Sequence, residues 1–221
     1  MHQPDVYVLL PTIYRPSQLR RVLESIRDTA PDIGIVVAIE QNDEASALVA
    51  HEFGAILTRC PDHQGGVSYA WNIALRAAPA TAQAFVLGAD DLIFKPGWYE
   101  ATISALDSIG GDGLVGFNDL HKSADFSTHF LMTRNHLVKV NGGVMACPHY
   151  RAEGVDYEAC RRAQKAGKYI KANAAQVEHD WNGRHPDQWF KLNMQSWGKT
   201  RRLMKEREKL GWPNDFKAVI V

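Results

Sequence analysis

The stretch of sequence that decides the fold is FVLGADDLIF, residues 85–94. Its first half is apolar enough to form a buried strand, and two carboxylates, Asp90 and Asp91, follow at once. Adjacent carboxylates repel one another, so we expect hydrogen-bond donors or a divalent cation beside them. Mg²⁺ and Mn²⁺ suit such a pair, because they take one or two protein carboxylates and leave positions for phosphate oxygens. The simpler alternative is that Asp91 caps the turn before Pro96 and Asp90 is solvated.

The first half of the chain alternates short apolar runs with helical patterns. Each run has the length of a strand buried on both faces, and the runs span residues 6–10, 35–39, 84–88 and, more weakly, 55–59. Apolar residues recur at helical spacing between them. This order predicts an α/β fold with a Rossmann-like, mostly parallel sheet flanked by helices. Ligands of such open sheets bind beyond the carboxyl ends of the strands.

The second half of the chain breaks this alternation. Its pattern predicts a helix, two strands, a glycine-rich turn, a second helix, two short strands and a long C-terminal helix, at about residues 97–109, 113–118, 128–133, 141–143, 155–166, 168–172, 175–179 and 186–209. No segment is rich enough in Pro, Gly and Ser to divide the chain. We therefore expect a single domain over residues 1–221, with a mixed second half from about residue 96.

Composition excludes several classes of protein. The 25 basic residues balance the 25 acidic ones, so no whole-molecule field attracts nucleic acid or acidic lipid. The three cysteines, Cys60, Cys147 and Cys160, are odd in number and lack CxxC spacing, which argues against both a disulfide framework and a thiolate zinc site. The start of the chain lacks the pattern of a signal peptide, and no run of about 18 apolar residues occurs. We expect a cytoplasmic protein with reduced thiols.

Polar or glycine residues follow every predicted strand of the first half. They are Pro11, Thr12 and Arg15 after the first strand, Asn42 and Asp43 after the second, Gly65 and Gly66 after the third, and Asp90 and Asp91 after the fourth. Loops are often polar simply because they meet water, so one such residue proves little. Because the carboxyl ends of parallel strands share one rim, the glycine pair and the carboxylate pair together predict a ligand site.

The order of these motifs resembles the family 2 glycosyltransferases, which have the A-type fold of nucleotide-diphospho-sugar transferases. The resemblance covers about residues 5–180 and is carried by LLPTIYRP, GGVSYAWNIALRAA, VLGADDLIF, EGVDYEACRRAQKAG and VEHDW. It implies sugar transfer, by a hexosyl- or pentosyltransferase, from a nucleotide-diphospho-sugar, with a UDP-sugar as the expected donor. Residues 1–95 would then bind the donor, and residues 96–221 would face the acceptor.

The resemblance also implies roles for single residues. The first-strand loop would hold the nucleotide base, and the glycine segment with Asn72 would contact the donor. Asp91 and His179 would hold Mn²⁺ or Mg²⁺, Asp90 would accept from the ribose hydroxyls, and Asp156 would be the catalytic base of an inverting reaction.

Two departures from the family pattern leave alternatives open. The family's aspartate motif has an Asp where this chain has Gly88, and its late Glu-Asp pair reads Val155-Asp156. Glu153 and Glu158 therefore stay as rival bases. Asp156 could also be only a helix cap, and His179 could be an ordinary, partly buried histidine.

The predicted C-terminal helix carries an apolar stripe and a basic stripe. The apolar stripe, best read as core, comprises Phe190, Met194, Trp197 and Met204; the basic one comprises Lys191, Arg202, Lys205 and Lys209. A basic helix face is usually just solvated, but a polyanionic acceptor such as DNA would dock there. One of Trp181, Trp189 and Trp197 could stack on a sugar ring.

Three rival functions make different demands on the sequence. A nucleotidyltransferase would need a glycine-rich loop after the first strand, and PTIYRPSQLR contains no glycine. A dinucleotide oxidoreductase would need GxGxxG at the same place. A non-catalytic module for sugars or nucleotides would bind at the rim without turnover.

Overall fold

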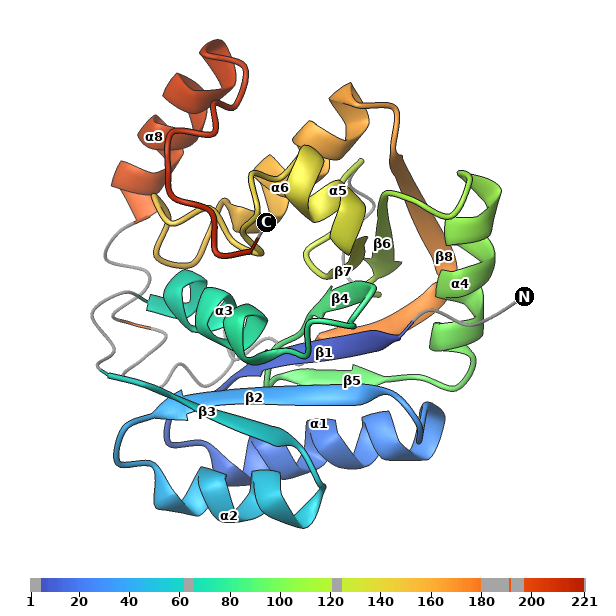
Figure 1. Cartoon of the computed structure of the whole chain (residues 1–221), viewed down its shortest axis with the longest axis vertical. Coiled ribbons are helices and arrows are strands. Elements are labelled where there is room, and N and C mark those ends of the chain that lie inside the picture. Colours follow the sequence, from blue (N-terminus) through green and yellow to red (C-terminus); the bar gives the residue numbers. More distant parts are fainter. Residues whose placement is uncertain (1–4, 62–65, 121–124, 180–190, 192–196, 221) are drawn as a thin grey trace.

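The computed structural model describes residues 5–61, 66–120, 125–179, 191 and 197–220. Its elements run in the order β1 (Val6–Pro11), α1 (Pro16–Thr29), β2 (Gly34–Glu40), α2 (Glu44–Glu52), β3 (Ile56–Cys60), α3 (Gly66–Ala77), β4 (Ala84–Leu87), β5 (Leu92–Phe94), α4 (Trp98–Ser108), β6 (Leu114–Asn118), β7 (Phe130–Thr133), α5 (Arg134–Lys139), α6 (Val155–Lys165), β8 (Tyr169–His179) and α8 (Trp197–Lys209). The described strands form an eight-stranded sheet, and the predicted α/β class is confirmed (Figure 1).

The sheet has a parallel half and a mixed half. Its strand order is β3-β2-β1-β4-β7-β6-β8-β5. The first four strands are parallel, as the alternating pattern predicts, whereas β7 is antiparallel to both β4 and β6. The carboxyl ends of β1, β2, β3 and β4 therefore meet at one rim.

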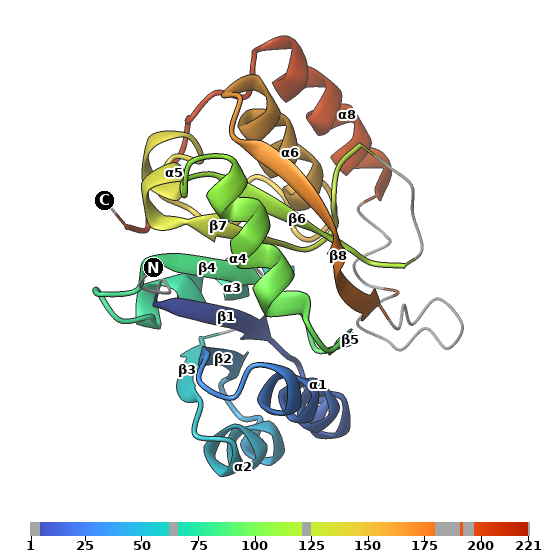
Figure 2. The same ribbon diagram turned by 90° about the vertical axis from the view of Figure 1, so that its right-hand side faces the viewer.

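Helices cover both faces of the sheet. The helices α1, α2 and α4 lie on one face, and α3, α5 and α6 lie on the other (Figures 1 and 2). Side chains of β1 alternate between the two cores, with Val8 and Leu10 in one and Leu9 in the other. This alternation explains why the strand reads as a continuous apolar run. None of the described helices is long and apolar enough to cross a membrane.

The second half of the chain differs from the sequence prediction at three points. The two short strands expected near residues 168–172 and 175–179 are one strand, β8, which continues through a shift in register opposite Gly116 and Asn118. The short elements β5 and α5 were not predicted. Of the long helix expected from Pro186, the structure describes α8 and Lys191, so Phe190, Met194, Trp181 and Trp189 lie outside the described residues.

The glycine-rich turn at residues 141–143 receives the C-terminal segment. The backbone N–H groups of Val219 and Ile220 donate to the carbonyl oxygen of Gly143, at 2.8 and 3.0 Å. Gly143 has φ +73°, and a Cβ there would overlap the carbonyl oxygen of Ile220. Glycine is therefore required twice at this position, once for the backbone conformation and once for the close approach.

We expect Gly143→Ala to lower the free energy of unfolding by about 2–4 kcal/mol, from left-handed backbone strain and displacement of the C-terminal segment. Gly110→Ala is the matched control, because Gly110 has φ +84° but no described atom within 4 Å of the place that a Cβ would take. It should cost only about 1–2 kcal/mol of strain. Thermal unfolding measures both variants, and equal losses would contradict the docking of the C-terminal segment.

Candidate active site

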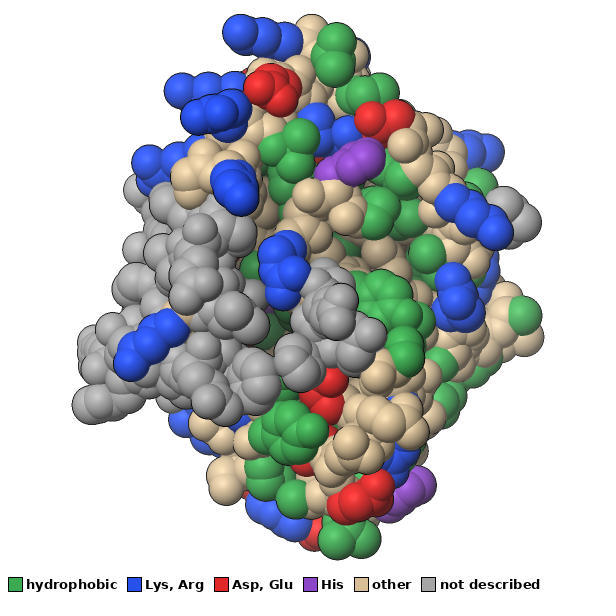
Figure 3. All heavy atoms as spheres, turned by 90° about the vertical axis from the view of Figure 1, so that its left-hand side faces the viewer, with side chains coloured by type: hydrophobic (Ala, Val, Ile, Leu, Met, Phe, Trp, Pro, Cys, Tyr) green, Lys and Arg blue, Asp and Glu red, His purple; other side chains and the backbone are tan. Residues whose placement is uncertain are grey.

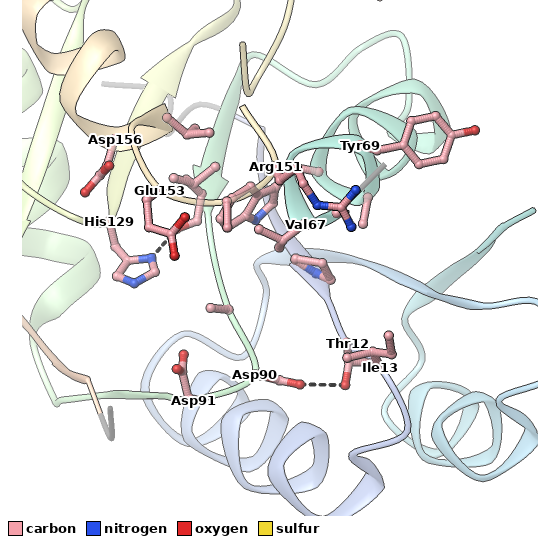
Figure 4. Close-up of a pocket in the computed structure, with 18 of the residues that line it drawn as sticks. Thr12, Ile13, Val67, Tyr69, Asp90, Asp91, His129, Arg151, Glu153 and Asp156 are labelled. Atoms are coloured by element: carbon pink, nitrogen blue, oxygen red, sulfur yellow. Dashed lines mark hydrogen bonds between the residues drawn. The ribbon is translucent and has the colours of Figure 1, made fainter. Parts of the chain in front are cut away.

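A pocket of about 320 Å³ opens at the carboxyl ends of the parallel strands (Figure 4). It brings together eight of the predicted site residues: Pro11, Thr12, Arg15, Gly66, Asp90, Asp91, Asp156 and His179. These residues come from β1, α3, β4, α6 and β8 and the loops beside them, so the pocket joins both halves of the chain. Gly65 lies outside the described residues.

Asp90 ties the end of β4 to the loop after β1. It is buried, and it accepts hydrogen bonds from Thr12 Oγ1 at 2.7 Å and from Arg15 Nη1 at 3.2 Å. Burial raises the pKa of Asp90, and the Arg15 guanidinium opposes that shift. The donors expected beside the carboxylate pair are therefore present, and Asp90 is not simply solvated.

The close approach of β1 and β4 favours glycine at position 88, where the family motif has an aspartate. A Cβ at Gly88 would lie 2.8 Å from Leu10 Cδ2 and 2.9 Å from Val8 Cγ1. The carbonyl oxygen of Gly88 also accepts a bond from Trp71 Nε1 at 2.7 Å, which packs α3 against the strand. A side chain at this position, such as the aspartate of the family motif, would require Leu10 and Val8 to shift.

Asp91 pairs with a histidine from the other end of the chain. The short strand β5 is antiparallel to β8, with Leu92 opposite His179, and this pairing places His179 Nε2 3.3 Å from Asp91 Oδ2. Burial alone would raise the pKa of Asp91, but the hydrogen bond to His179 and the positive charge of the His179 ring lower it overall. Asp91 Oδ1 is buried without a hydrogen-bond partner among the described residues.

The donor set of Asp91 and His179 fits a divalent cation. A buried carboxylate oxygen without a partner is one that a cation could satisfy, and carboxylate oxygen and imidazole nitrogen both bind Mn²⁺. In the part of the chain that the structure describes, no group of three or more His, Cys, Asp and Glu side chains could hold a metal ion together. This pair would therefore leave most of the coordination sphere to phosphate oxygens and water.

His129 is a pocket residue that sequence reasoning missed, because nothing marks it within its predicted strand. Its Nδ1 lies 3.0 Å from the carbonyl oxygen of Leu87, which can only accept, so Nδ1 carries the proton. Burial lowers the pKa of His129 to about 4, and the ring stays neutral. It packs edge-on against the His179 ring, with 5.0 Å between centroids. His129 thus orients the histidine beside Asp91.

Residues between 151 and 156 form the wall of the pocket opposite Asp90 and Asp91 (Figure 4). The buried carboxylate of Glu158 fixes this wall in place. It accepts five hydrogen bonds, one from Tyr150 and two each from Arg162 and Arg207. Burial alone would raise the pKa of Glu158, but these bonds lower it overall. Glu158 does not line the pocket, and its oxygens are occupied, so the structure offers no role for it as a base.

Asp156 and Glu153 lie in that wall and line the pocket. Gly154, with φ +94°, is the N-cap of α6. Asp156 is therefore not the N-cap residue of α6; it lies in the first turn of the helix. The Oε2 atom of Glu153 is buried without a hydrogen-bond partner among the described residues, and burial raises the pKa of Glu153.

Three predicted donor residues lie outside the pocket lining: Asn42, Asp43 and Asn72. Asp43 caps α2 through Ser46 N at 3.1 Å and accepts from Tyr14 N at 2.6 Å, so the first two loops do meet. Among the described residues, the buried side chain of Asn72 bonds to backbone groups of residues 145 and 146. Glu40, at the end of β2, lines the pocket, whereas the nearby Asn42 and Asp43 do not.

Residues 7–162 match the family described as glycosyl transferase family 2. The match covers more than half of the chain and includes both sides of the pocket. The chain belongs to glycosyl transferase family 2. It is thus a glycosyltransferase, and the resemblance drawn from its motifs is confirmed. A comparison with curated protein sequences found no match.

Solved structures share the fold of this glycosyltransferase. The mannosyltransferase PcManGT from Pyrobaculum calidifontis, in complex with GDP-Man and Mn²⁺, has a TM-score of 0.70 at 15% identity, over 99% of this chain and 66% of that one. Glucosyl-3-phosphoglycerate synthase from Mycobacterium tuberculosis, in complex with Mn²⁺ and UDP, has a TM-score of 0.65 at 15% identity, over 96% and 82%. TarS of S. aureus has a TM-score of 0.66 at 10% identity, over 92% of this chain and 39% of that one.

We expect Arg207→Ala to lower the free energy of unfolding by about 3–5 kcal/mol, because it leaves the buried Glu158 short of a partner. Arg202→Ala, on the exposed face of the same helix, is the matched control and should change it by about 0.5 kcal/mol or less. Urea unfolding measures both. Similar values for the two variants would mean that the ion-pair network does not hold the wall.

Proposed function

We propose that this glycosyltransferase moves a sugar from a nucleoside-diphosphate sugar to an acceptor hydroxyl, with inversion and with a bound divalent cation. The observation that carries the proposal is the pair of acidic groups on opposite sides of one pocket: Asp91 beside His179 on one side and Asp156 on the other (Figure 4). Such an arrangement separates the group that faces the diphosphate from the group that takes a proton.

The donor would lie along the rim from β1 to β5. The loop after β1, with Pro11, Thr12 and Arg15, and Glu40 at the end of β2 form the side of the pocket on which the nucleoside would bind. Asp90, fixed by Thr12 and Arg15, would accept from the ribose hydroxyls with its remaining lone pairs. PcManGT in complex with GDP-Man and the synthase in complex with UDP support a nucleotide on this fold, and a UDP-sugar is the first donor to test.

A cation held by Asp91 and His179 would neutralise the charge that develops on the departing diphosphate. The structures of PcManGT and of glucosyl-3-phosphoglycerate synthase both contain Mn²⁺, which makes Mn²⁺ the first choice and Mg²⁺ the second. His129, neutral and hydrogen-bonded to Leu87, would keep the His179 ring in place.

Asp156 would act as the general base. Its carboxylate would take the proton of the acceptor hydroxyl while the acceptor oxygen bonds to the anomeric carbon and the bond from that carbon to the diphosphate oxygen breaks. The electron pair of the broken bond leaves with the diphosphate. Attack from the face opposite the leaving group inverts the anomeric centre, and no covalent intermediate is required.

Basic side chains gather on the exposed face of α8, among them Lys199, Arg202, Lys205 and Lys209 (Figure 3). A polyanionic acceptor such as DNA gains no support from the solved structures, whose bound molecules are sugar nucleotides, nucleotides and phosphoglyceric acid derivatives.

The cation site predicts metal-dependent binding of nucleotides. Mn²⁺ should raise the affinity of the wild-type protein for UDP or GDP by about tenfold or more, equivalent to about 1.4 kcal/mol, and Asp91→Ala should abolish that gain. Asp28→Ala, on the exposed face of α1, is the control. Calorimetry with and without Mn²⁺ measures the effect, and an undiminished gain in Asp91→Ala would refute the assignment.

The base assignment predicts a loss of turnover without a loss of binding. Asp156→Asn keeps the volume of the side chain but cannot take a proton, so transfer or donor hydrolysis should fall about 10²- to 10⁴-fold. Donor affinity and melting temperature should stay close to wild type, because Gly154 and not Asp156 caps α6. A variant that turns over at the parent rate would move the base to another group. A wild type that binds donor without any turnover would favour the binding module instead.

A further inference from the structure

Glu153 has a buried atom that the mechanism above leaves unused. Its side chain extends from the loop before α6 into the pocket, next to Asp156 and across from Asp90 and Asp91 (Figure 4). The Oε2 atom is buried without a hydrogen-bond partner among the described residues. A buried carboxylate oxygen without a donor destabilises the folded protein, so its presence calls for an explanation.

The loop does not need Glu153 to hold its shape. Tyr150, at its start, donates to Glu158 at 2.8 Å, and Ser68 N donates to the carbonyl oxygen of Arg151 at 3.0 Å. Gly154 at its end packs against Met204 and begins α6. Other groups fix the backbone on both sides, and the carboxylate of Glu153 bonds to its own backbone N–H and, among the described residues, ties no second element to the loop. Side chains that lower the stability of the folded protein without stabilising another element are typical of binding sites.

The surroundings restrict the ligand group that Glu153 could bind. A carboxylate accepts hydrogen bonds and repels anions, which excludes the diphosphate as its partner. The diphosphate would lie on the opposite side of the pocket, beside Asp91 and His179. Asp156, which would meet the acceptor hydroxyl, follows on the same wall three positions later. The part of the donor between these two places is the sugar ring, whose hydroxyl groups are donors.

We propose that Glu153 accepts a hydrogen bond from a hydroxyl group of the transferred sugar and thereby selects the donor. The inference rests on the proposed function and assigns a sugar contact within the same pocket. A site built to bind a hydroxyl rejects an analogue that lacks it much more strongly than an apolar site rejects an extra group, because the buried acceptor is left without a partner.

The test separates binding of the sugar from binding of the nucleotide. Calorimetry in Mn²⁺ gives Kd for UDP and UDP-glucose, and for GDP and GDP-mannose, with wild type, Glu153→Ala, Glu153→Gln and the exposed control Glu206→Ala. In Glu153→Ala, Kd for the diphosphate should stay within about twofold. The ratio of the sugar-nucleotide Kd to the diphosphate Kd should rise about 10- to 100-fold, the range expected for a lost hydrogen bond to a charged group. Glu153→Gln should fall between Glu153→Ala and wild type.

Melting temperatures without ligand provide a second readout. Glu153→Ala and Glu153→Gln should melt at the wild-type temperature or above it, because they remove the charge of a carboxylate whose buried Oε2 has no hydrogen-bond partner among the described residues. A structural residue would lower it. Deoxy analogues of the bound sugar nucleotide then identify the hydroxyl: the analogue that lacks it should bind wild type and Glu153→Ala about equally.

Three results would overturn the assignment. They are unchanged Kd values for both ligands in Glu153→Ala, an equal loss of affinity for diphosphate and sugar nucleotide in that variant, and a wild type that binds a diphosphate but none of the sugar nucleotides. A wild type that binds neither diphosphates nor sugar nucleotides refutes the proposed function itself, and this result is distinct from the other three.

Discussion

The carboxylate of Asp90 is buried at the carboxyl end of the central parallel strands, and the site is arranged around the need to compensate its charge. An unpaired ionised carboxylate in such a place would be very costly. Thr12 and Arg15 supply the compensation, and in doing so they bind the loop after β1 to the end of β4. Asp91 is then left with one oxygen toward His179 and one without a partner among the described residues. Two adjacent aspartates thus have different environments, one satisfied by the protein and the other open to a ligand.

The opposite wall depends on a second buried carboxylate. Glu158 holds Tyr150 at one end of the wall segment, and Arg207 from α8 reaches it across 49 residues of sequence. The C-terminal segment closes over the turn at Gly143 and shields this network. Burying a charged group is tolerated here because five hydrogen bonds satisfy Glu158. The C-terminal helix, in which sequence patterns indicate only an apolar and a basic stripe, therefore supports the wall that carries Glu153 and Asp156.

Sequence patterns predict the site best where a strand ends. Pro11, Thr12, Arg15, Asp90 and Asp91 all line the pocket, since the carboxyl ends of parallel strands must meet at one rim. The patterns fail where a polar residue has a local task. Asp43 caps a helix and Asn72 ties down a backbone turn, and each role uses the same side-chain chemistry as ligand binding. His129 and the open oxygen of Glu153 carry no local signal, because their positions depend on which strands and loops pack together.

The amino-acid sequence by itself determined the parallel first half of the sheet, its helices and the family, because apolar period and motif order are local properties of the chain. Tertiary structure decided which distant groups meet. His179 reaches Asp91 across 88 residues because the three residues of β5 pair with the end of β8. That pairing, like the continuity of β8, depends on long-range hydrogen bonds whose partners no short window of sequence contains. The same reason separates Glu153 from Glu158: five residues apart on one segment, one carboxylate faces the pocket and the other is fully bonded in the core.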